Sequence, residues 1–423
     1  MKTEPTERTH PSAASKRPRK SLAPALWSAR PRREHEAAMR WQRGSISPLH
    51  LAAEPPVSRP LIRTIERVQL GRGPIRVSRV IFGSMAIGSA RHDRGRRIAT
   101  IHAAVDAGMT SIDSAPMYDL GACEVAVGEA IRGRRDRVQL LSKVGLRWDD
   151  PRGKILFTTR DDTGRLVAVR KNSRPESIRL EVERSLERLG CDVLDTVHVH
   201  MRDPLTPIED TMGALKDLLR EGKLRAIGVS TNFGPHEIAE AQRALGDVPL
   251  ASLQVCYNLL DRSCEKELVP IAQKDSIAIL ARSPLAMGLL TGKVGPWSTF
   301  NENDLRRNMP TFHRDNLRQI SIAVQHGLAP IAAAHDVSVA AVALAWVLNR
   351  PAVSAVVVGA SHPHQILANA EAIELELDAD EQKQIEQQFD ALVLNPHAGV
   401  GFGRRSLQQG RWLAGVVGRR ISR

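Results

Sequence analysis

Short apolar runs alternate with amphipathic stretches along most of this chain. Runs rich in Val, Ile and Leu centre near Val80, Ser111, Leu140, Thr196, Ala226, Leu253, Ile279 and Ala355. Stretches with apolar residues at helical spacing follow most of them, at 98–107, 124–131, 176–189, 208–219, 235–245, 265–273, 318–334 and 339–348. Strand signals that alternate with helix signals in this way predict a (β/α)8 TIM barrel in a single domain.

An open, doubly wound parallel sheet would show the same alternation of strands and helices. Sheets of that kind more often carry a glycine-rich turn directly after the first strand. No GxGxxG stands after the run at Val80. The barrel is therefore the favoured architecture.

Two long segments interrupt the rhythm. Residues 145–172 contain two strand-like halves on either side of the sequence DDTG, which predicts an inserted hairpin. Residues 285–316 form a second insertion that includes Trp297 and Phe300. Both insertions follow the carboxyl ends of predicted barrel strands, so we expect them to form substrate-binding walls or a lid.

The two ends of the chain differ from its middle. Residues 1–62 are rich in Pro, Ser, Ala and Arg without a sustained period, which predicts a basic, disordered extension. A start at Met39 and an anchoring arm stay open as alternatives. Residues 63–395 are the predicted barrel domain, which begins with a hairpin, and residues 396–423 form a basic C-terminal tail.

Composition changes this picture little for the barrel. The chain is 42% hydrophobic and 25% charged, which are ordinary values for a folded, water-soluble protein. The formal net charge of +13 comes largely from the two ends, so no specific nucleic-acid partner is expected for the barrel. Nucleic-acid binding through the tails is a separate hypothesis. No apolar run reaches the roughly 18 residues of a membrane helix, so no membrane partner is expected.

The cysteines indicate a reducing compartment. They form no CxxC pair and have no metal-ligand spacing with histidine: Cys123, Cys191, Cys256 and Cys264. This pattern argues against a disulfide framework and against a structural zinc site. We therefore expect a cytoplasmic protein with no metal site.

The candidate chemistry lies at three predicted strand ends. Residues 109–113 are a predicted buried strand that ends in Asp113, and the following loop carries Tyr118, one of only two tyrosines in the chain. Two further strands end near Lys143 and His200. In a parallel α/β barrel such side chains meet at the carboxyl ends of the strands, where a rigid scaffold holds them.

A tyrosine beside a lysine can act as a proton donor. The pKa of a free tyrosine is about 10, and lowering it by about three units takes about 4 kcal/mol. One ammonium about 4 Å away supplies about that much at an effective dielectric constant near 20. We therefore expect Lys143 to lower the pKa of Tyr118 and Asp113 to hold the lysine. His200 would orient a carbonyl substrate or relay a proton.

These segments resemble the aldo-keto reductase superfamily over about residues 65–395. SIDSAPMYDLGACEVAVGEAI resembles its Asp and Tyr segment, LLSKVG its Lys strand, and LDTVHVHMRDP its catalytic His strand. In the last segment the spacing from Asp195 favours His200 over His198. The resemblance implies a (β/α)8 barrel that binds NADPH across its carboxyl end and reduces aldehydes or ketones without a metal. The catalytic residues that it implies are Tyr118, Asp113, Lys143 and His200.

The resemblance also implies a cofactor site. RAIGVSTNF and SLQVCYNLLDR resemble the segments that hold the nicotinamide, ARSPLAMGLLTGK the loop around the pyrophosphate, and VVVGASHPHQILAN the adenosine-binding stretch. The implied cofactor-binding residues are Ser230, Asn232, Gln254, Arg282, Ser283, Leu285, Gly288, Lys293, Gly359, Ser361, Gln365 and Asn369. A serine that opens a helix exposes N–H groups that suit a phosphate.

Three residues depart from the family pattern. Thr231 is inserted between Ser230 and Asn232, which leaves open which of the three contacts the nicotinamide amide. Met201 replaces the aromatic residue that is common after the catalytic histidine. Ser361 stands where many members have the arginine that recognises the 2′-phosphate, so NADH stays open beside NADPH.

The resemblance therefore implies an NAD(P)H-dependent carbonyl reductase, or the reverse alcohol oxidation, with Tyr118 as the general acid. Its substrate would be a small-molecule carbonyl or a sugar-like compound. A cofactor-sensing regulatory or binding protein on the same barrel is the competing hypothesis. A homo-oligomer stays open.

Overall fold

The computed structural model describes residues 65–88, 93–301 and 304–398. The predicted extension 1–62 and the tail from residue 399 onwards lie outside these residues. The domain boundaries at residues 62 and 395 accordingly stay predictions.

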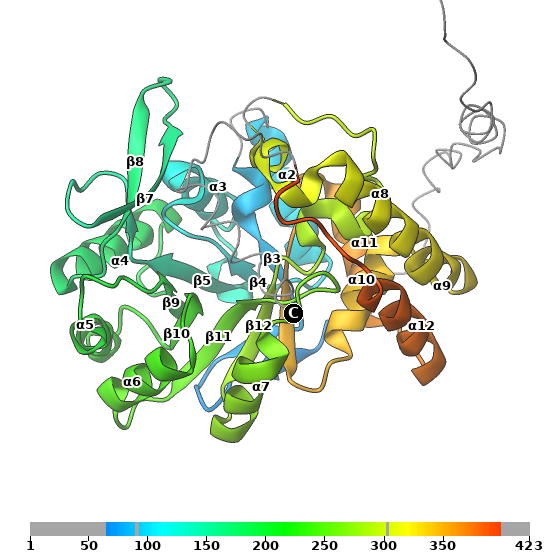
Figure 1. Ribbon diagram of the computed structural model, residues 1–423. Coiled ribbons are helices and arrows are strands. Elements are labelled where there is room, and N and C mark those ends of the chain that lie inside the picture. The colour runs from blue at the N-terminus through cyan, green and yellow to red at the C-terminus, as the bar shows by residue number, and fades with distance from the viewer. Residues whose placement is uncertain (1–64, 89–92, 302–303, 399–423) are drawn as a thin grey trace, which may run out of the picture. The chain divides into compact units, whose positions relative to one another are not determined.

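Eight parallel strands close into a barrel, which confirms the predicted fold (Figure 1). Around the barrel the order is β10, β11, β12, β13, β3, β4, β5 and β9. Their bounds are β3 (Val80–Gly83), β4 (Ser111–Asp113), β5 (Gln139–Val144), β9 (Thr196–Met201), β10 (Ile227–Thr231), β11 (Leu250–Cys256), β12 (Ala278–Arg282) and β13 (Val353–Gly359). Each strand contains or adjoins one of the apolar runs, because a strand covered on both faces needs no polar side.

Helices alternate with these strands. The helices that connect barrel strands are α2 (Arg94–Asp106), α3 (Ala122–Ala130), α4 (Pro175–Leu189), α5 (Ile208–Arg220), α6 (Pro235–Leu245), α7 (Cys264–Asp275) and α10 (Val339–Leu348). After β13 come α11 (Pro363–Ala370) and α12 (Ala379–Asp390). The single helix expected at 318–334 is instead α8 (Arg314–Ala323), a π-turn (Val324–Leu328) and α9 (Ala329–Ala334). Pro330 explains the break, since it has no N–H to continue the helical hydrogen bonds.

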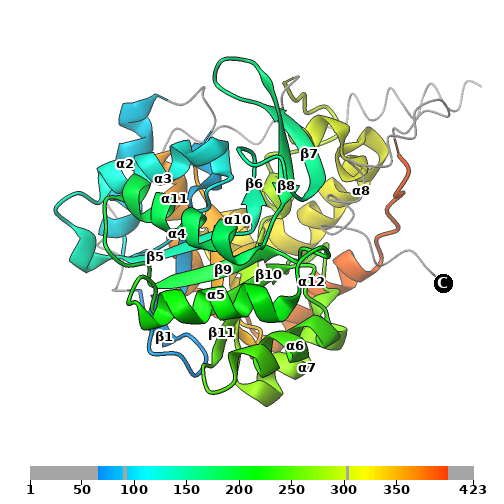
Figure 2. The ribbon, with the colours of Figure 1, turned by 90° about the vertical axis from the view of Figure 1, so that its left-hand side faces the viewer.

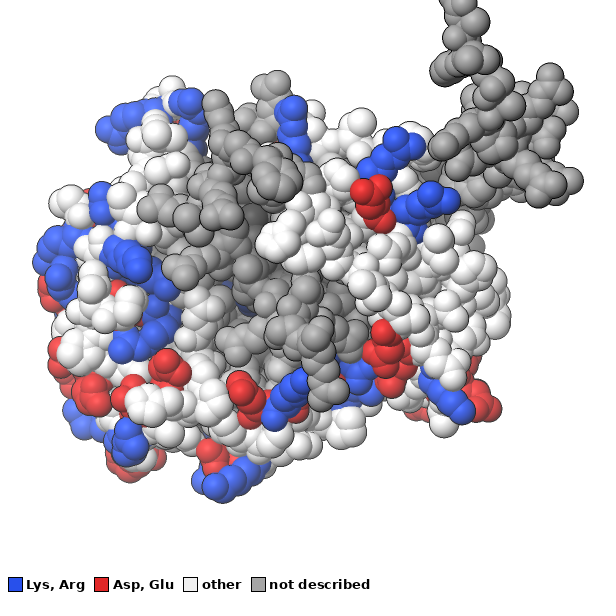
Figure 3. Space-filling model, in the orientation of Figure 1, with Lys and Arg blue, Asp and Glu red and all other residues white. Residues whose placement is uncertain are grey.

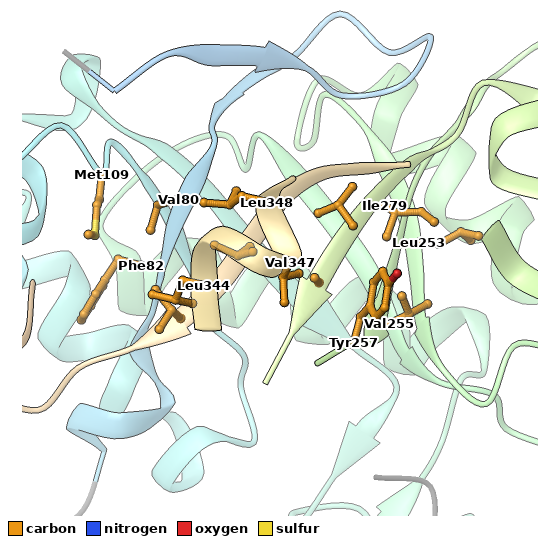
Figure 4. Packing of buried hydrophobic residues seen from close by; sticks show 14 of the residues in the cluster. Val80, Phe82, Met109, Leu253, Val255, Tyr257, Ile279, Leu344, Val347 and Leu348 are labelled. Carbon is orange, nitrogen blue, oxygen red and sulfur yellow. The ribbon is translucent and has the colours of Figure 1, made fainter. Parts of the chain in front are cut away.

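The main core lies between the barrel and its surrounding helices. Figure 4 shows Leu344, Val347 and Leu348 of α10 beside Val80 of β3 and Ile279 of β12. Helix α10 is apolar on nearly every side, and its residues from Ala341 to Leu348 are buried. A helix without a polar face is stable only where protein covers it.

An antiparallel hairpin of β1 (Arg67–Gln69) and β2 (Arg76–Ser78) precedes the barrel, as predicted. Leu70 and Val77 of this hairpin pack with Ile81, Leu141 and Leu280 in a second buried cluster. The hairpin therefore packs against the barrel strands themselves.

The first insertion is a three-stranded antiparallel sheet in the order β6, β8, β7. Its strands are β6 (Leu146–Arg147), β7 (Lys154–Arg160) and β8 (Leu166–Lys171). Figure 2 shows β7 and β8 extending away from the barrel. The turn between them is held by the carboxylate of Asp161, which accepts hydrogen bonds from the N–H of Thr163 and of Arg165. The predicted hairpin is confirmed, and β6 is an additional strand.

No single helix in the described part of the chain is long and apolar enough to cross a membrane. The bent pair 314–334 and 339–348, with a 94° angle between its halves, meets the length and composition test together. The four cysteines are free thiols.

Candidate active site

Three neighbouring strands bring the four predicted catalytic residues together. Asp113 is the last residue of β4, Lys143 lies near the end of β5, and His200 lies near the end of β9. The order β4, β5, β9 in the barrel places these strands side by side. Tyr118 begins the 3-10 turn that follows β4.

Asp113 and Lys143 form a buried ion pair. Lys143 Nζ lies 2.5 Å from Asp113 Oδ2, and the two side chains are 1% and 3% exposed. The same ammonium donates to the carbonyl oxygen of Ser114 at 3.1 Å. Gln254 Nε2 donates to Asp113 Oδ1 at 2.8 Å, so both carboxylate oxygens have a partner. Charges so deeply buried are tolerated only when they are paired and hydrogen-bonded.

Tyr118 lies against this pair. Lys143 Nζ is 4.8 Å from the centre of the phenol ring, and the ring of His200 meets it edge-on at a centroid distance of 5.9 Å. The turn after Tyr118 has left-handed backbone at Asp119 and Leu120, with φ of 49° and 50°. Such backbone costs about 1 kcal/mol or more per residue and is found disproportionately at functional sites.

The pKa of Tyr118 differs from the prediction. Burial raises the pKa of this phenol, and Lys143 lowers it by less, so the pKa is higher than that of a free tyrosine. Lys143 lowers the pKa, as predicted, but the expected net fall below the value of a free tyrosine is wrong, because desolvation of the phenolate outweighs one ammonium. Tyr118 is consequently protonated at neutral pH.

The other two ionisable groups have defined charges. Burial lowers the pKa of Lys143, but Asp113 and Tyr118 raise it by more, so the ammonium is retained. Burial and the nearby Lys143 hold the pKa of His200 well below the usual range of histidine. His200 is therefore a neutral imidazole at physiological pH.

His198 is a packed barrel residue. Its Nε2 lies 2.8 Å from Ser252 Oγ, and burial lowers its pKa to about 3. A Cβ at Gly228 would come within 2.5 Å of the ring, so the glycine makes room for the imidazole. This arrangement agrees with the choice of His200 as the catalytic candidate.

The predicted nicotinamide contacts surround the ion pair. Ser230 Oγ donates to the carbonyl oxygen of Gln254 at 2.9 Å, and Gln254 in turn binds Asp113. Asn232 has a left-handed backbone with φ of 63°. Arg282 lies close enough to influence the pKa of both Tyr118 and His200, and its buried Nε has no hydrogen-bond partner among the described residues.

The loop after β12 has an unusual backbone. Five of its residues have positive φ: Ser283 at 54°, Ala286 at 46°, Met287 at 56°, Gly288 at 97° and Gly292 at 74°. Leu285 precedes the 3-10 turn Ala286–Thr291, and Lys293 follows it. Turns of this kind point successive backbone N–H groups in one direction, an arrangement that suits a phosphate. Arg306 of the second insertion donates to the carbonyl oxygen of Met287 at 3.4 Å.

The predicted adenosine contacts lie at the end of β13, in the turn that follows it and in α11. The N–H of Ser361 donates to Gln365 Oε1 at 2.8 Å, so these two residues hold one another. Asn369 is only 4% exposed, and none of the hydrogen bonds of the described residues uses its side-chain amide. Gly359 lies where a Cβ would meet that of Ala86 at 3.0 Å.

The sequence did not indicate Arg96. This residue of α2 places its Nη1 3.1 Å from His362 Nε2, across 266 positions in the chain. No carboxylate within the described residues pairs with its guanidinium. Only the packing of α2 beside α11 brings it to the adenosine segment. Within the described ranges, the uncompensated charge of Arg96, the free amide of Asn369 and the free Nε of Arg282 suit an extended, anionic dinucleotide. No group of His, Cys, Asp and Glu in the described residues could hold a metal ion.

Comparison with known proteins agrees with this geometry. The model of the aldo/keto reductase family matches residues 79–389. Aldo-keto reductase YhdN of Bacillus subtilis is 35% identical over 327 residues, which are 76% of this chain and 93% of that protein. The NADH-specific methylglyoxal reductase of Escherichia coli is 34% identical over 326 residues, which are 75% of this chain and 96% of that protein.

Solved structures agree as well. The glycerol dehydrogenase AKR11B4 of Gluconobacter oxydans superposes with a TM-score of 0.68 at 34% identity, over 77% of this chain and 96% of that one. The aldo-keto reductase AKR11C1 of Bacillus halodurans gives a TM-score of 0.62 at 26% identity, over 79% and 99%. These names are those of enzymes, so the sensor hypothesis is not favoured. The chain belongs to the aldo/keto reductase family, a family of nicotinamide-dependent oxidoreductases.

Proposed function

We propose that this chain reduces an aldehyde or ketone with Tyr118 as the general acid. The observation that carries the proposal is the buried ion pair of Lys143 and Asp113 against the Tyr118 ring. A phenol that is protonated at neutral pH and lies beside a permanent cation is ready to give up its proton. A nicotinamide bound at the predicted cofactor residues would supply the hydride.

The remaining residues prepare Tyr118 for this step. Lys143 stabilises the phenolate that forms as the proton leaves. Asp113 fixes the ammonium through Oδ2, while Gln254 fixes Asp113 through Oδ1. His200, a neutral imidazole at the edge of the phenol ring, holds the carbonyl oxygen of the substrate in place.

Replacement of Tyr118 tests this assignment. In Tyr118→Phe we expect kcat to fall by about 10²-fold or more, with NADPH affinity retained, because general acid catalysis is worth about 10²–10⁴-fold. NADPH oxidation with a panel of aldehydes and ketones measures the loss. Tyr257→Phe removes the only other tyrosine and is the matched control. Equal turnover by Tyr118→Phe and wild type would refute the role.

We further propose that NADPH is preferred over NADH. Ser361 cannot supply the positive charge that a 2′-phosphate needs. The guanidinium of Arg96, however, contacts His362, the residue that follows Ser361 in the chain. A phosphate beside an unpaired arginine forms a strong, charge-assisted contact. The Escherichia coli relative is named as NADH-specific, so the preference is a property to be measured for this chain.

Equilibrium binding of the two cofactors tests the preference. Wild type should bind NADPH more tightly than NADH, and Arg96→Gln should lose about ten-fold in NADPH affinity while its NADH affinity is retained. Arg94→Gln is the control, since Arg94 lies on the same helix but is exposed and paired with Glu129. Tighter binding of NADH by wild type would show that Arg96 does not serve the 2′-phosphate.

A further inference from the structure

Three cations from three elements lie together beside the candidate active site. Lys171, the last residue of β8, faces Lys154 of β7 across the hairpin. Lys171 Nζ donates to the carbonyl oxygen of Arg202 at 3.1 Å, and Arg202 directly follows β9. Lys and Arg side chains gather over the surface around β7, β8 and α4 in Figure 3. We refer to Lys154, Lys171 and Arg202 as the cation cluster.

The cation cluster has no carboxylate partner. None of its three members forms a salt bridge within the described residues, although neighbouring arginines do: Arg147 pairs with Asp149 and Arg152 pairs with Asp150. Burial together with Lys154 and Arg202 lowers the pKa of Lys171, and Asp203 raises it by less. Unpaired like charges that lie this close repel one another, so an anion placed among them is stabilised.

Asp203 offsets part of the positive charge at Lys171, but its carboxylate is hydrogen-bonded within its own loop and forms no salt bridge with the cluster. Its Oδ2 accepts from the N–H of Ser173 at 3.1 Å and from the hydroxyl of Thr206 at 2.8 Å. Its Oδ1 accepts from the N–H of Leu205 at 3.0 Å. These contacts tie Asp203 to its own loop, and the ammonium of Lys171, which has three N–H donors, uses one of them for the carbonyl oxygen of Arg202.

An apolar wall connects the cluster to the catalytic candidates. Met201 lies between His200 and Arg202 in the chain and packs with Leu146 and Val169. The partly buried Met117, which precedes Tyr118, and Trp148 pack against the same group. His200 and Arg202 are two strand positions apart, a spacing of about 7 Å. Leu146, Val169 and Met201 are buried beneath this wall, and the partly buried Met117 and Trp148 form its accessible side. A ligand whose carbonyl lies at Tyr118 and His200 can extend along Met117 and Trp148 to the cations.

We propose that the preferred substrate is a small aldehyde or ketone that also carries a carboxylate or phosphate group. The carbonyl lies at Tyr118 and His200, the middle of the molecule contacts the apolar wall, and the anionic group lies in the cation cluster. This inference rests on the proposed reductase function and adds the charge of its substrate.

Matched substrate pairs test the proposal. For the carboxylate, 4-carboxybenzaldehyde is compared with its neutral methyl ester; for the phosphate, glyceraldehyde 3-phosphate is compared with glyceraldehyde. In wild type at low salt, kcat/KM for at least one anionic substrate should exceed that of its neutral counterpart by about ten-fold, and added salt should reduce the ratio. The pair with the larger ratio identifies the anionic group.

Variants assign the effect to the cluster. In Lys171→Gln and in Arg202→Gln the ratio of anionic to neutral kcat/KM should fall by about ten-fold. Arg220→Gln removes one positive charge from the exposed surface of α5 and should leave the ratio unchanged. A wild-type ratio near or below one for both pairs, or an unchanged ratio in Lys171→Gln, overturns the proposal.

Binding separates this inference from the reductase function. Terephthalate has no reducible aldehyde or ketone group. Calorimetry should show that it binds the NADP⁺ complex of wild type about ten-fold more tightly than the NADP⁺ complex of Lys171→Gln. If neither aldehyde is reduced but this difference appears, the reductase proposal fails and the anion site stands. If the aldehydes are reduced but terephthalate binds both proteins equally, the anion-site proposal is wrong and the reductase proposal stands.

Discussion

Asp113 is the residue on which the catalytic candidates depend most, because its two oxygens bind Lys143 and Gln254. In Asp113→Asn we expect the ammonium to lose its counter-charge inside the barrel. Removing one partner of a buried pair costs about 3–5 kcal/mol. Urea denaturation should show this loss, and kcat should fall with it. Stability equal to wild type would mean that the ion pair contributes little to the fold.

The pH dependence of reduction follows from Tyr118. Its pKa is raised by burial, so the acid form that donates the proton is present through the neutral range and is lost only as pH rises through that raised pKa. The rate of reduction should therefore stay level near neutrality and fall on the alkaline side. In Lys143→Met the cation that lowers this pKa is gone, so the fall should move to still higher pH. Steady-state kcat against pH measures both profiles.

A fall in kcat between pH 6 and pH 8 in wild type would contradict this assignment. His200 does not produce such a fall, because its low pKa keeps it neutral there. The profile of His200→Gln, which keeps a neutral hydrogen-bonding side chain, provides the comparison.

At the scale of elements, Glu181 of α4 holds the junction between β5 and the inserted sheet. Both of its carboxyl oxygens accept from the N–H of Gly145, at 3.0 and 3.1 Å. Gly145 has φ of 93°, a conformation that favours glycine. Burial raises the pKa of Glu181 to about 8.

This raised pKa makes stability depend on pH. The pKa of this carboxyl is higher in the folded protein than its value of about 4.3 in the unfolded chain. The folded protein is therefore more stable at acid pH, and this advantage is lost as pH rises through the folded-state pKa. Between pH 5 and pH 8.5, the free energy of unfolding of wild type should fall by about 4 kcal/mol more than that of Glu181→Gln. Urea denaturation at both pH values measures the difference. Parallel losses in the two proteins would show that Glu181 does not cause the effect.

At the scale of the whole molecule, the barrel should be independent of both chain ends. The family match covers residues 79–389 and so does not extend into either end of the chain. A chain limited to residues 63–398 should melt within a few degrees of the full protein and keep its kcat/KM. Circular dichroism and the aldehyde assay measure this. A large loss of stability would assign a structural role to one of the removed ends.

The same truncation tests the separate role of the basic ends. If they bind nucleic acid, affinity should fall steeply with salt in the full chain and vanish in the 63–398 chain. Salt-independent binding, or binding kept by the truncated chain, would place the interaction elsewhere. The cytoplasmic location stays a prediction from the cysteine pattern.

Sequence alone determined the class of fold and the identity of the catalytic candidates. Each barrel strand is covered on both faces, so it leaves an uninterrupted apolar run that can be recognised without knowing its neighbours. Asp113, Tyr118, Lys143 and His200 follow from their places at strand ends and from the family resemblance. The broken helix around Pro330 was missed, although the proline itself signals it.

Tertiary structure alone decided the charges and the long-range contacts. Burial is a property of the folded chain, so it reversed the expected direction of the Tyr118 pKa, which a pairwise estimate with Lys143 could not foresee. The contact of Arg96 with His362 and the meeting of Lys171 with Arg202 join elements whose distance in space no local pattern records. Local periodicity specifies elements, whereas desolvation and charge depend on which elements lie side by side.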